Sequence, residues 1–296
     1  MIEARFNVAT IHDDFDLFRS ALTNTEAESG FIARLIEKDY FCSLILSFIY
    51  GGSSHSLVFK GGTCLSKVYT DFNRLSEDLD FVLSTAIDAK RSERRARMMP
   101  VKSLLSGLPG GITGLHMASP LEGHNQSTQY IASLEYQSAV TGGKEQIKIE
   151  IGLREPLLRP ERIQPARTLM VSGLTRRAVV RPFDVVVMDV QEAYAEKCRA
   201  ALTRREPAIR DLFDIHHGTT RLGIDVLDPE FIKMVKMKLV VPGNPAVDIS
   251  SERRETLVRQ LDAELRPVLR QTDFNNFDLD AALRTVNRLA EAVDKM

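Results

Sequence analysis

The sequence predicts a mixed α/β fold followed by a helical C-terminal portion. Three observations predict it: short apolar runs of strand length alternate with helical segments in the first part, glycine pairs mark turns beside such runs, and the pattern becomes almost entirely helical from about residue 185. We therefore expect a mixed sheet with helices in a first domain at residues 1–185 and an α-helical domain at residues 186–296.

Composition restricts the class of protein. The chain has 296 residues, of which 44% are hydrophobic and 27% charged, values typical of a soluble globular chain large enough for two domains. The net charge of −1 means that any attraction to nucleic acid must come from local patches. Cys42, Cys64 and Cys198 lie far apart without a CxxC pair, which indicates a reducing, cytoplasmic location. The acidic N-terminal segment predicts neither a signal peptide nor an anchor, and no apolar run has membrane-spanning length.

The first predicted elements surround a glycine pair. Apolar residues at helical spacing predict a core helix over residues 31–50, ended by Gly51-Gly52-Ser53-Ser54. A short apolar run at Leu57–Phe59 then predicts a strand, Gly61-Gly62 a turn, and Thr63 the beginning of a helix. This part of the chain is therefore expected to read strand, glycine turn, helix.

The next elements complete the predicted sheet. Asp78–Leu83 predicts a second strand, and residues 87–105 predict a strongly basic helix. Gln129–Tyr136 and Gln146–Leu153 alternate in polarity and flank Gly142-Gly143, which indicates two strands of a hairpin.

The segment that follows changes character twice. Residues 154–181 are rich in proline and arginine, which predicts an irregular crossing with one short strand at Thr168–Val171. Asp189 and Glu192 then have capping-box spacing, in which Asp189 accepts a helix-start N–H and Glu192 reaches back. The remaining pattern predicts helices to about Arg204, from Pro207, and near residues 229–239, 251–268 and 278–294.

Two aspartates interrupt an otherwise apolar strand. Side chains at i and i+2 share a face, so Asp78 and Asp80 point the same way while Leu79 and Phe81 point to the core. Carboxylates this close repel unless a cation lies between them, and Mg²⁺ is usually held by one or two carboxylates plus substrate phosphates. Glu150 occupies the polar face of another predicted strand as a possible third ligand. The alternative is an edge strand that carries charges against aggregation.

The Gly61-Gly62 turn is a possible phosphate cradle. Glycines let backbone N–H groups approach an anion, and the following helix adds the positive end of its dipole. Lys67, one turn into that helix, is a possible phosphate contact, and an exposed helical lysine is the alternative. The stretch is neither a Walker A loop nor GxGxxG.

These features occur in the order of the nucleotidyltransferase superfold, and their surroundings resemble one family. KGGTCLSKVY, RLSEDLDF, KIEI and EKCRAALTRREPAIRDLFDI are similar to the four motifs of the AbiEii/AbiGii toxins. These are nucleotidyltransferase-like toxins of bacterial type IV toxin–antitoxin and phage-abortive systems and include the MenT toxins. The resemblance covers roughly residues 55–217 and is most specific in the second and fourth motifs.

The resemblance implies a role for particular residues. Gly61, Gly62 and Thr63 fall in the nucleotide-phosphate loop, with Thr63 or Ser66 as the hydroxyl contact. Asp78 and Asp80 fall on the metal-binding pair, with Glu150 as the third acid. The family implies that Lys197 contacts nucleotide phosphates and that Asp211 is essential.

The implied reaction is Mg²⁺- or Mn²⁺-dependent transfer of NMP from an NTP to RNA. The implied acceptor is the tRNA 3′ end, with Asp80 or Glu150 helping to activate the attacking hydroxyl and with the second domain completing the active site. A cognate antitoxin is the implied partner. The alternatives are nucleotidyl transfer to a protein side chain and a catalytically silent nucleotide sensor. Ser76 lies two residues before Asp78, where some relatives are silenced by modification, so we expect a possible regulatory phosphorylation there.

Three further features bear on partners and metals. Six Lys or Arg against one Glu in Lys90–Lys102, with Arg91, Arg94 and Arg95 on one helical face, indicate an RNA-backbone surface, a solvated face or a surface for an acidic partner. Residues 154–181 carry seven Arg against two Glu and are open to the same interpretations. His216-His217 lacks the context of a zinc site and is expected to be structural.

Overall fold

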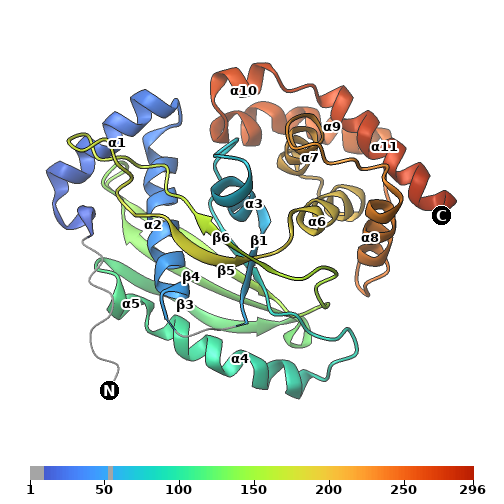
Figure 1. Ribbon diagram of the computed structural model, residues 1–296, viewed down its shortest axis with the longest axis horizontal. Coiled ribbons are helices and arrows are strands. Elements are labelled where there is room, and N and C mark those ends of the chain that lie inside the picture. Colours follow the sequence, from blue (N-terminus) through green and yellow to red (C-terminus); the bar gives the residue numbers. More distant parts are fainter. Residues whose placement is uncertain (1–9, 53–55) are drawn as a thin grey trace. The chain divides into compact units, whose positions relative to one another are not determined.

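The computed structural model describes residues 10–52 and 56–296, which form two compact units that are considered separately (Figure 1). Unit 1 contains the described residues up to Leu157 together with Glu161–Val187, and unit 2 contains Leu158–Pro160 and Met188–Met296. The predictions for the first nine residues and for Ser53-Ser54 fall outside the described part of the chain. Within that part, no helix is both long and apolar enough to cross a bilayer.

Unit 1 is built on a mixed sheet with the strand order β3-β4-β5-β2-β1-β7-β6. Strand β2 runs parallel to β5 and β1 runs parallel to β7, whereas the other neighbouring pairs are antiparallel. The sheet and its helices confirm the predicted fold class. The strands are β1 (Val58–Lys60), β2 (Leu79–Val82), β3 (Leu115–His124), β4 (Gln129–Gln137), β5 (Lys144–Gly152), β6 (Arg162–Ala166) and β7 (Phe183–Val187).

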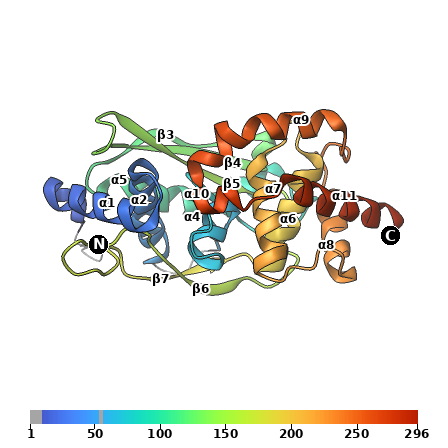
Figure 2. The ribbon, with the colours of Figure 1, turned by 90° about the horizontal axis from the view of Figure 1, so that it is seen from above.

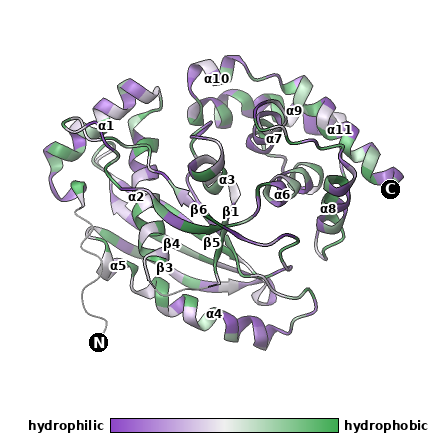
Figure 3. Ribbon diagram, in the orientation of Figure 1, coloured by the Kyte–Doolittle hydropathy of each residue, from purple (hydrophilic) through white to green (hydrophobic). Residues whose placement is uncertain are grey.

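The helices of unit 1 differ strongly in burial. Helix α2 is buried along most of its length, and its position against the sheet is visible in Figure 1. The first half of α4 is instead strongly hydrophilic (Figure 3). Helix α3 continues directly into a π-helical turn at Leu65–Tyr69. The helices are α1 (Phe15–Ser29), α2 (Ala33–Tyr50), α3 (Gly61–Cys64), α4 (Arg91–Ser106) and α5 (Leu108–Gly111).

A buried ion pair joins α2 to the helical segment that follows the glycine pair. The Lys67 ammonium is fully buried and lies 2.6 Å from Asp39 Oδ1. It also donates to Ser43 Oγ, to the Asp39 carbonyl and to the Arg167 carbonyl. An exposed helical lysine was one expectation for Lys67, and this expectation is wrong because every donor of the ammonium is used inside unit 1.

Two parts of the sheet differ from the predictions. The long strand β3 was not predicted, because its exposed polar residues and Pro120 obscure the alternation and its pairing with β4 shifts register twice. The predicted strand at Thr168–Val171 is wrong: the strand of this crossing is β6. The predicted segment is held by side chains of other elements, as when Leu169 N–H donates to Asp39 Oδ2, and only Val171 forms a bridge, with Ala178.

Unit 2 is helical, as expected, and Figure 2 shows α6 beside α7. Asp189 caps α6 by accepting from Gln191 N–H. The predicted reciprocal contact of Glu192 is wrong, because this buried carboxylate accepts from the Leu158 and Arg159 amides and pairs with Lys238. The helices are α6 (Val190–Thr203), α7 (Ile209–Arg221), α8 (Pro229–Leu239), α9 (Ser251–Gln260), α10 (Gln271–Asn275) and α11 (Leu279–Lys295).

The buried pair of α2 gives a direct stability prediction. Lys67→Met strands the Asp39 carboxylate in the core, so the free energy of unfolding should fall by about 3–5 kcal/mol in urea denaturation. Adding Asp39→Asn removes the stranded charge and should recover part of the loss. A Lys67→Met protein as stable as the wild type would contradict the importance of this pair.

Candidate active site

The first glycine of the KGGT turn allows a close approach to β2. Gly61 has φ +76°, a left-handed conformation that favours glycine. A Cβ atom at this position would lie 2.3 Å from Asp80 Oδ2. The carboxylate of Asp80 therefore packs directly against the backbone of the turn, and a side chain at residue 61 would displace it.

The second glycine faces a different set of groups. A Cβ atom on Gly62 would lie 2.5 Å from Arg74 Nη2 and 2.9 Å from Ser76 Oγ. Arg74 is buried, and its Nη1 donates to the Leu75 carbonyl. The turn thus has the Asp80 carboxylate against one glycine and a guanidinium and a hydroxyl against the other.

The hydroxyls predicted to contact nucleotide are used inside unit 1. Thr63 Oγ1 donates to the Asp78 carbonyl, and Ser66 Oγ donates to the Arg74 carbonyl at 2.7 Å. Both side chains are almost fully buried. Together with the buried Lys67 ammonium, these hydroxyls position the segment that leads into β2. All three side chains are therefore poorly placed to contact a phosphate.

The predicted acids meet on one face of two interior strands. Strands β2 and β5 pair in parallel with Asp80 opposite Glu150, and Lys148 precedes Glu150 on the same face. Strand β2 lies between β1 and β5, and β5 lies between β2 and β4. The alternative of an edge strand that carries protective charges is therefore wrong.

A lysine lies among these acids. Lys148 Nζ is 3.3 Å from Glu150 Oε2 and 3.8 Å from Asp78 Oδ2. Glu150 is held a second time, because Gln129 Nε2 donates to its Oε1 at 2.7 Å. The sequence analysis did not single out Lys148 or Gln129, although Lys148 stands in the same KIEI stretch as the predicted third acid.

The electrostatics of the face follow from this arrangement. Burial raises the pKa of Asp80 to about 6, opposed by Lys60 and reinforced by the negative charges of Glu150 and Asp78. Partial burial lowers the pKa of Lys148, but the negative charges of Asp78, Glu150 and Asp80 outweigh this effect, so its pKa is raised. The face holds more negative charge than Lys148 alone can neutralise.

This donor set fits a divalent cation in part. Among the residues that the structure describes, no group of three or more His, Cys, Asp or Glu side chains is placed to hold a metal ion. A magnesium site needs only one or two protein carboxylates when substrate phosphates supply other oxygens, and Asp78 and Asp80 meet that requirement. Glu150 already accepts from Lys148 and Gln129, so Asp78 and Asp80 are better candidates for metal ligands than Glu150 is.

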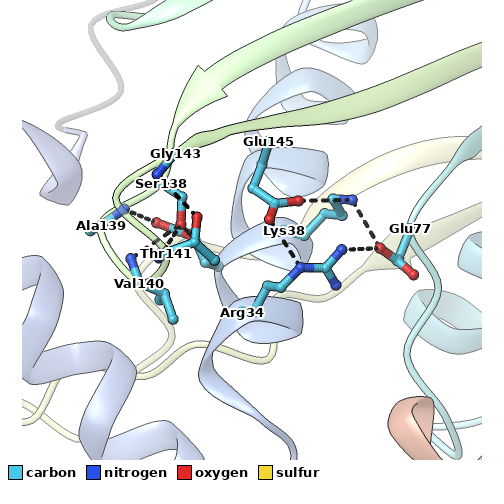
Figure 4. A network of polar contacts seen from close by, with 10 residues as sticks. Arg34, Lys38, Glu77, Ser138, Ala139, Val140, Thr141, Gly143 and Glu145 are labelled. Carbon is cyan, nitrogen blue, oxygen red and sulfur yellow. Dashed lines mark hydrogen bonds and ion pairs between the residues drawn. The ribbon is translucent and has the colours of Figure 1, made fainter.

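Ion pairs from α2 hold Glu77, the residue that precedes Asp78 (Figure 4). Glu77, next to Asp78 in the sequence, accepts from Arg34 at 3.2 Å and from Lys38 at 2.9 Å. The same two cations pair with Glu145 at the beginning of β5. The signal for this network was visible in the sequence as charged residues inside an apolar helical run.

Unit 2 gathers the residues of the fourth motif. Lys197 Nζ on α6 lies 2.8 Å from Asp211 Oδ1 and 2.9 Å from Asp214 Oδ2 on α7. Arg204, just after α6, lies 3.2 Å from Asp211 Oδ2. Burial opposes ionisation of Asp211, but Lys197 and Arg204 hold the pKa of its carboxyl below the usual value. Helices α6 and α7 thus bring Lys197, Asp211 and Asp214 together.

The histidine pair lies on the same helix and packs against aromatic rings. His217 stacks on Phe213, and His216 meets Phe277 edge to face. Burial lowers the pKa of both imidazoles. These contacts are those of structural histidines.

Comparison with known protein families agrees with this architecture. A mixed sheet with a glycine turn, paired aspartates and a following helical unit defines the nucleotidyltransferase class. A family model described as nucleotidyl transferase AbiEii toxin, Type IV TA system, matches residues 46–292. The chain belongs to this family of toxin nucleotidyltransferases, and membership implies a nucleotide substrate and a cognate antitoxin.

Solved structures show the same fold at low sequence identity. MenT4, the nucleotidyltransferase toxin Rv2826c from Mycobacterium tuberculosis H37Rv, is 20% identical with a TM-score of 0.52, covering 94% of this chain and 97% of its own. JHP933 from Helicobacter pylori is 18% identical with a TM-score of 0.51, covering 90% and 94% respectively. The comparison with curated proteins gave no match. At these identities the similarity supports the fold of this chain and does not identify its substrate.

The raised pKa of Asp80 gives a pH-dependent prediction for the metal-free protein. Because the fold disfavours the ionised carboxylate, stability falls as pH rises from about 4, near the unfolded pKa, to about 6. Asp80→Asn should therefore increase the free energy of unfolding above pH 6 by up to about 3 kcal/mol. The difference should vanish below pH 4, where both states carry the proton.

Urea denaturation in EDTA at several pH values measures this difference. A variant that is less stable than the wild type at pH 8, or a difference that does not change with pH, would contradict the assigned environment of Asp80.

Proposed function

We propose that this toxin nucleotidyltransferase transfers NMP from an NTP to an RNA acceptor with the help of Mg²⁺ or Mn²⁺. The observation that carries the proposal is the pair formed by Asp78, immediately before the interior strand β2, and Asp80 on that strand, with Asp80 packed against the Gly61 backbone. The family resemblance favours the tRNA 3′ end as the acceptor, so that the added nucleotide blocks translation and growth.

Asp78 and Asp80 would hold the metal ion, which supplies positive charge at the triphosphate when it is bound. The Gly61-Gly62 turn, which lies directly against Asp80, would offer backbone N–H groups to the phosphates. An acceptor hydroxyl attacks the α-phosphorus in line, the bond to the β-phosphate oxygen breaks, and pyrophosphate leaves. Asp80 or Glu150 would help to activate the attacking hydroxyl by accepting its proton.

We propose a nucleotide-binding role for the fourth motif, which lies in unit 2. Lys197 would contact nucleotide phosphates, and Asp211 and Asp214 would hold its ammonium in place until the nucleotide arrives. Arg204 is half exposed and pairs with the same Asp211, so it is a second cation for the phosphates. These roles rest on the family motif together with the ion pairs.

Labelled-nucleotide transfer tests the proposal. With Mg²⁺, each α-labelled NTP and total RNA, the wild type should label RNA, and Asp80→Asn should abolish labelling and growth inhibition. Asp184→Asn, which changes an exposed aspartate on β7, is the matched control and should retain activity. Label on protein would support the side-chain acceptor, and no label with any NTP would support a silent sensor.

The basic helix supplies a surface for the RNA backbone. Lys90, Arg91, Arg95 and Arg97 are exposed, and within the described residues they form no ion pair with an acid. The expectation that Arg94 shares this face is wrong, because Arg94 is buried and donates to the Leu153 and Ile87 carbonyls. Met99 is the one large apolar side chain exposed on α4, and the rest of its exposed face is polar or charged, which favours phosphate over a protein partner.

Charge reversal tests this surface. Arg91→Glu with Arg95→Glu should weaken RNA binding roughly tenfold and reduce the slope of log Kd against log salt, because phosphate contacts release counterions. Fluorescence anisotropy with labelled RNA measures both. Arg254→Glu with Arg266→Glu changes the same charge on arginines already paired with Asp280 and Asp262, and should have little effect.

Ser76 is proposed as a regulatory position because its hydroxyl lies against Gly62 and two residues before Asp78. A phosphate there adds about two negative charges beside the turn and repels a triphosphate. Ser76→Glu should reduce nucleotide transfer at least tenfold, whereas Ser76→Ala should remain active. Full activity of Ser76→Glu in the same assay would contradict this role.

A further inference from the structure

Lys148 is the cation that the metal-free protein places among its acids. Its ammonium lies 3.3 Å from Glu150 Oε2 and 3.8 Å from Asp78 Oδ2. Asp80 lies on the same face, opposite Glu150 in the register of β2 and β5. Because both strands are interior to the sheet, this lysine does not serve to protect a sheet edge.

The two contacts of Lys148 are unequal. Glu150 is its neighbour on the same strand and is also fixed by Gln129, so the Lys148–Glu150 pair belongs to β5 and its partner β4. The contact with Asp78 crosses to β2 and is longer. Both Lys148 and Asp78 are about half exposed, so the bond between them is screened and open to exchange with a dissolved cation.

We propose that Lys148 is a positioning residue that competes with the divalent cation for Asp78. In the metal-free protein its ammonium neutralises Asp78 and keeps the acids of β2 and β5 together. A divalent cation on Asp78 and Asp80 must replace this contact, after which Lys148 stays with Glu150. This inference rests on the proposed function, because it takes the metal site of that function as given.

The same arrangement explains why Glu150 is a poor third metal ligand here. Its two oxygens already accept from Lys148 and from Gln129, so a metal ion on Glu150 would have to share an oxygen with one of these donors or displace it. The three acids thus have different roles in this proposal: Asp78 and Asp80 bind the metal ion, and Glu150 holds the competing Lys148 ammonium.

Mn²⁺ binding to the full chain tests the proposal without nucleotide or turnover. Free Mn²⁺ is measured by electron paramagnetic resonance at pH 8, where the carboxylates are ionised. Lys148→Met removes the competitor and should bind Mn²⁺ roughly two- to fivefold more tightly, the range expected for one screened ion pair. Lys148→Arg keeps the cation and should bind as the wild type does.

Lys144→Met is the matched control, because Lys144 lies on the same strand but pairs with Glu135 of β4. It should leave Mn²⁺ affinity unchanged, and Asp80→Asn should weaken it strongly. Equal or weaker Mn²⁺ binding by Lys148→Met would overturn the proposal, since a merely structural lysine does not lower metal affinity. Tighter binding by both Lys148→Met and Lys148→Arg would also overturn it.

The outcomes separate this inference from the proposed function. If the wild type binds Mn²⁺ and transfers nucleotide but Lys148→Met does not bind more tightly, only the role of Lys148 fails. If Lys148→Met binds more tightly but no NTP yields label, the proposed reaction fails and the role of Lys148 stands. Absence of Mn²⁺ binding in both wild type and Lys148→Met overturns the role of Lys148.

Discussion

The buried ion pair between Lys67 and Asp39 is the constraint on which the rest of unit 1 depends. Burying two charges is costly unless each is paired and hydrogen-bonded, and both conditions are met at this site. The pair fixes the segment after the KGGT turn against α2, and Leu169 fixes the crossing segment to the same carboxylate. The position of the turn relative to β2 follows from this attachment.

Helix α2 extends the same principle along its length. Arg34 and Lys38 hold Glu77 and Glu145, which stand at the entrances to β2 and β5 (Figure 4). Glu37 is buried and accepts from Ser138 and Ala139 in the turn between β4 and β5. The strands that carry the candidate metal ligands are thus held at their ends by charges of one helix, which leaves the carboxylates of Asp78 and Asp80 available.

Unit 2 also buries charged side chains, but its ion pairs join two neighbouring helices. Its acid Asp211 is buried, but Lys197 and Arg204 lie against it and hold its pKa below the usual value, and the buried Asp214 pairs with the same lysine. In the proposed role of Lys197, a nucleotide phosphate would have to compete with two carboxylates, which favours the high charge of a triphosphate. In both units, a lysine in the candidate site is paired with acids of the same unit. Lys148 of unit 1 pairs with Glu150 and Asp78, and Lys197 of unit 2 pairs with Asp211 and Asp214.

The sequence by itself determined the mixed α/β class with a helical C-terminal portion, the strand–glycine turn–helix unit and the shared face of Asp78 and Asp80, because these follow from repeat periods of about two and 3.6 residues and from the conformational freedom of glycine. It did not reveal β3 or β6, in which polar residues and a proline obscure the alternation. Only the tertiary structure decided that Lys67 is buried, that Glu192 faces Leu158 and Lys238, and that Lys148 lies among the acids. A charged residue has the same local pattern whether its partner is water or a side chain distant in sequence, and that difference is decided only by packing.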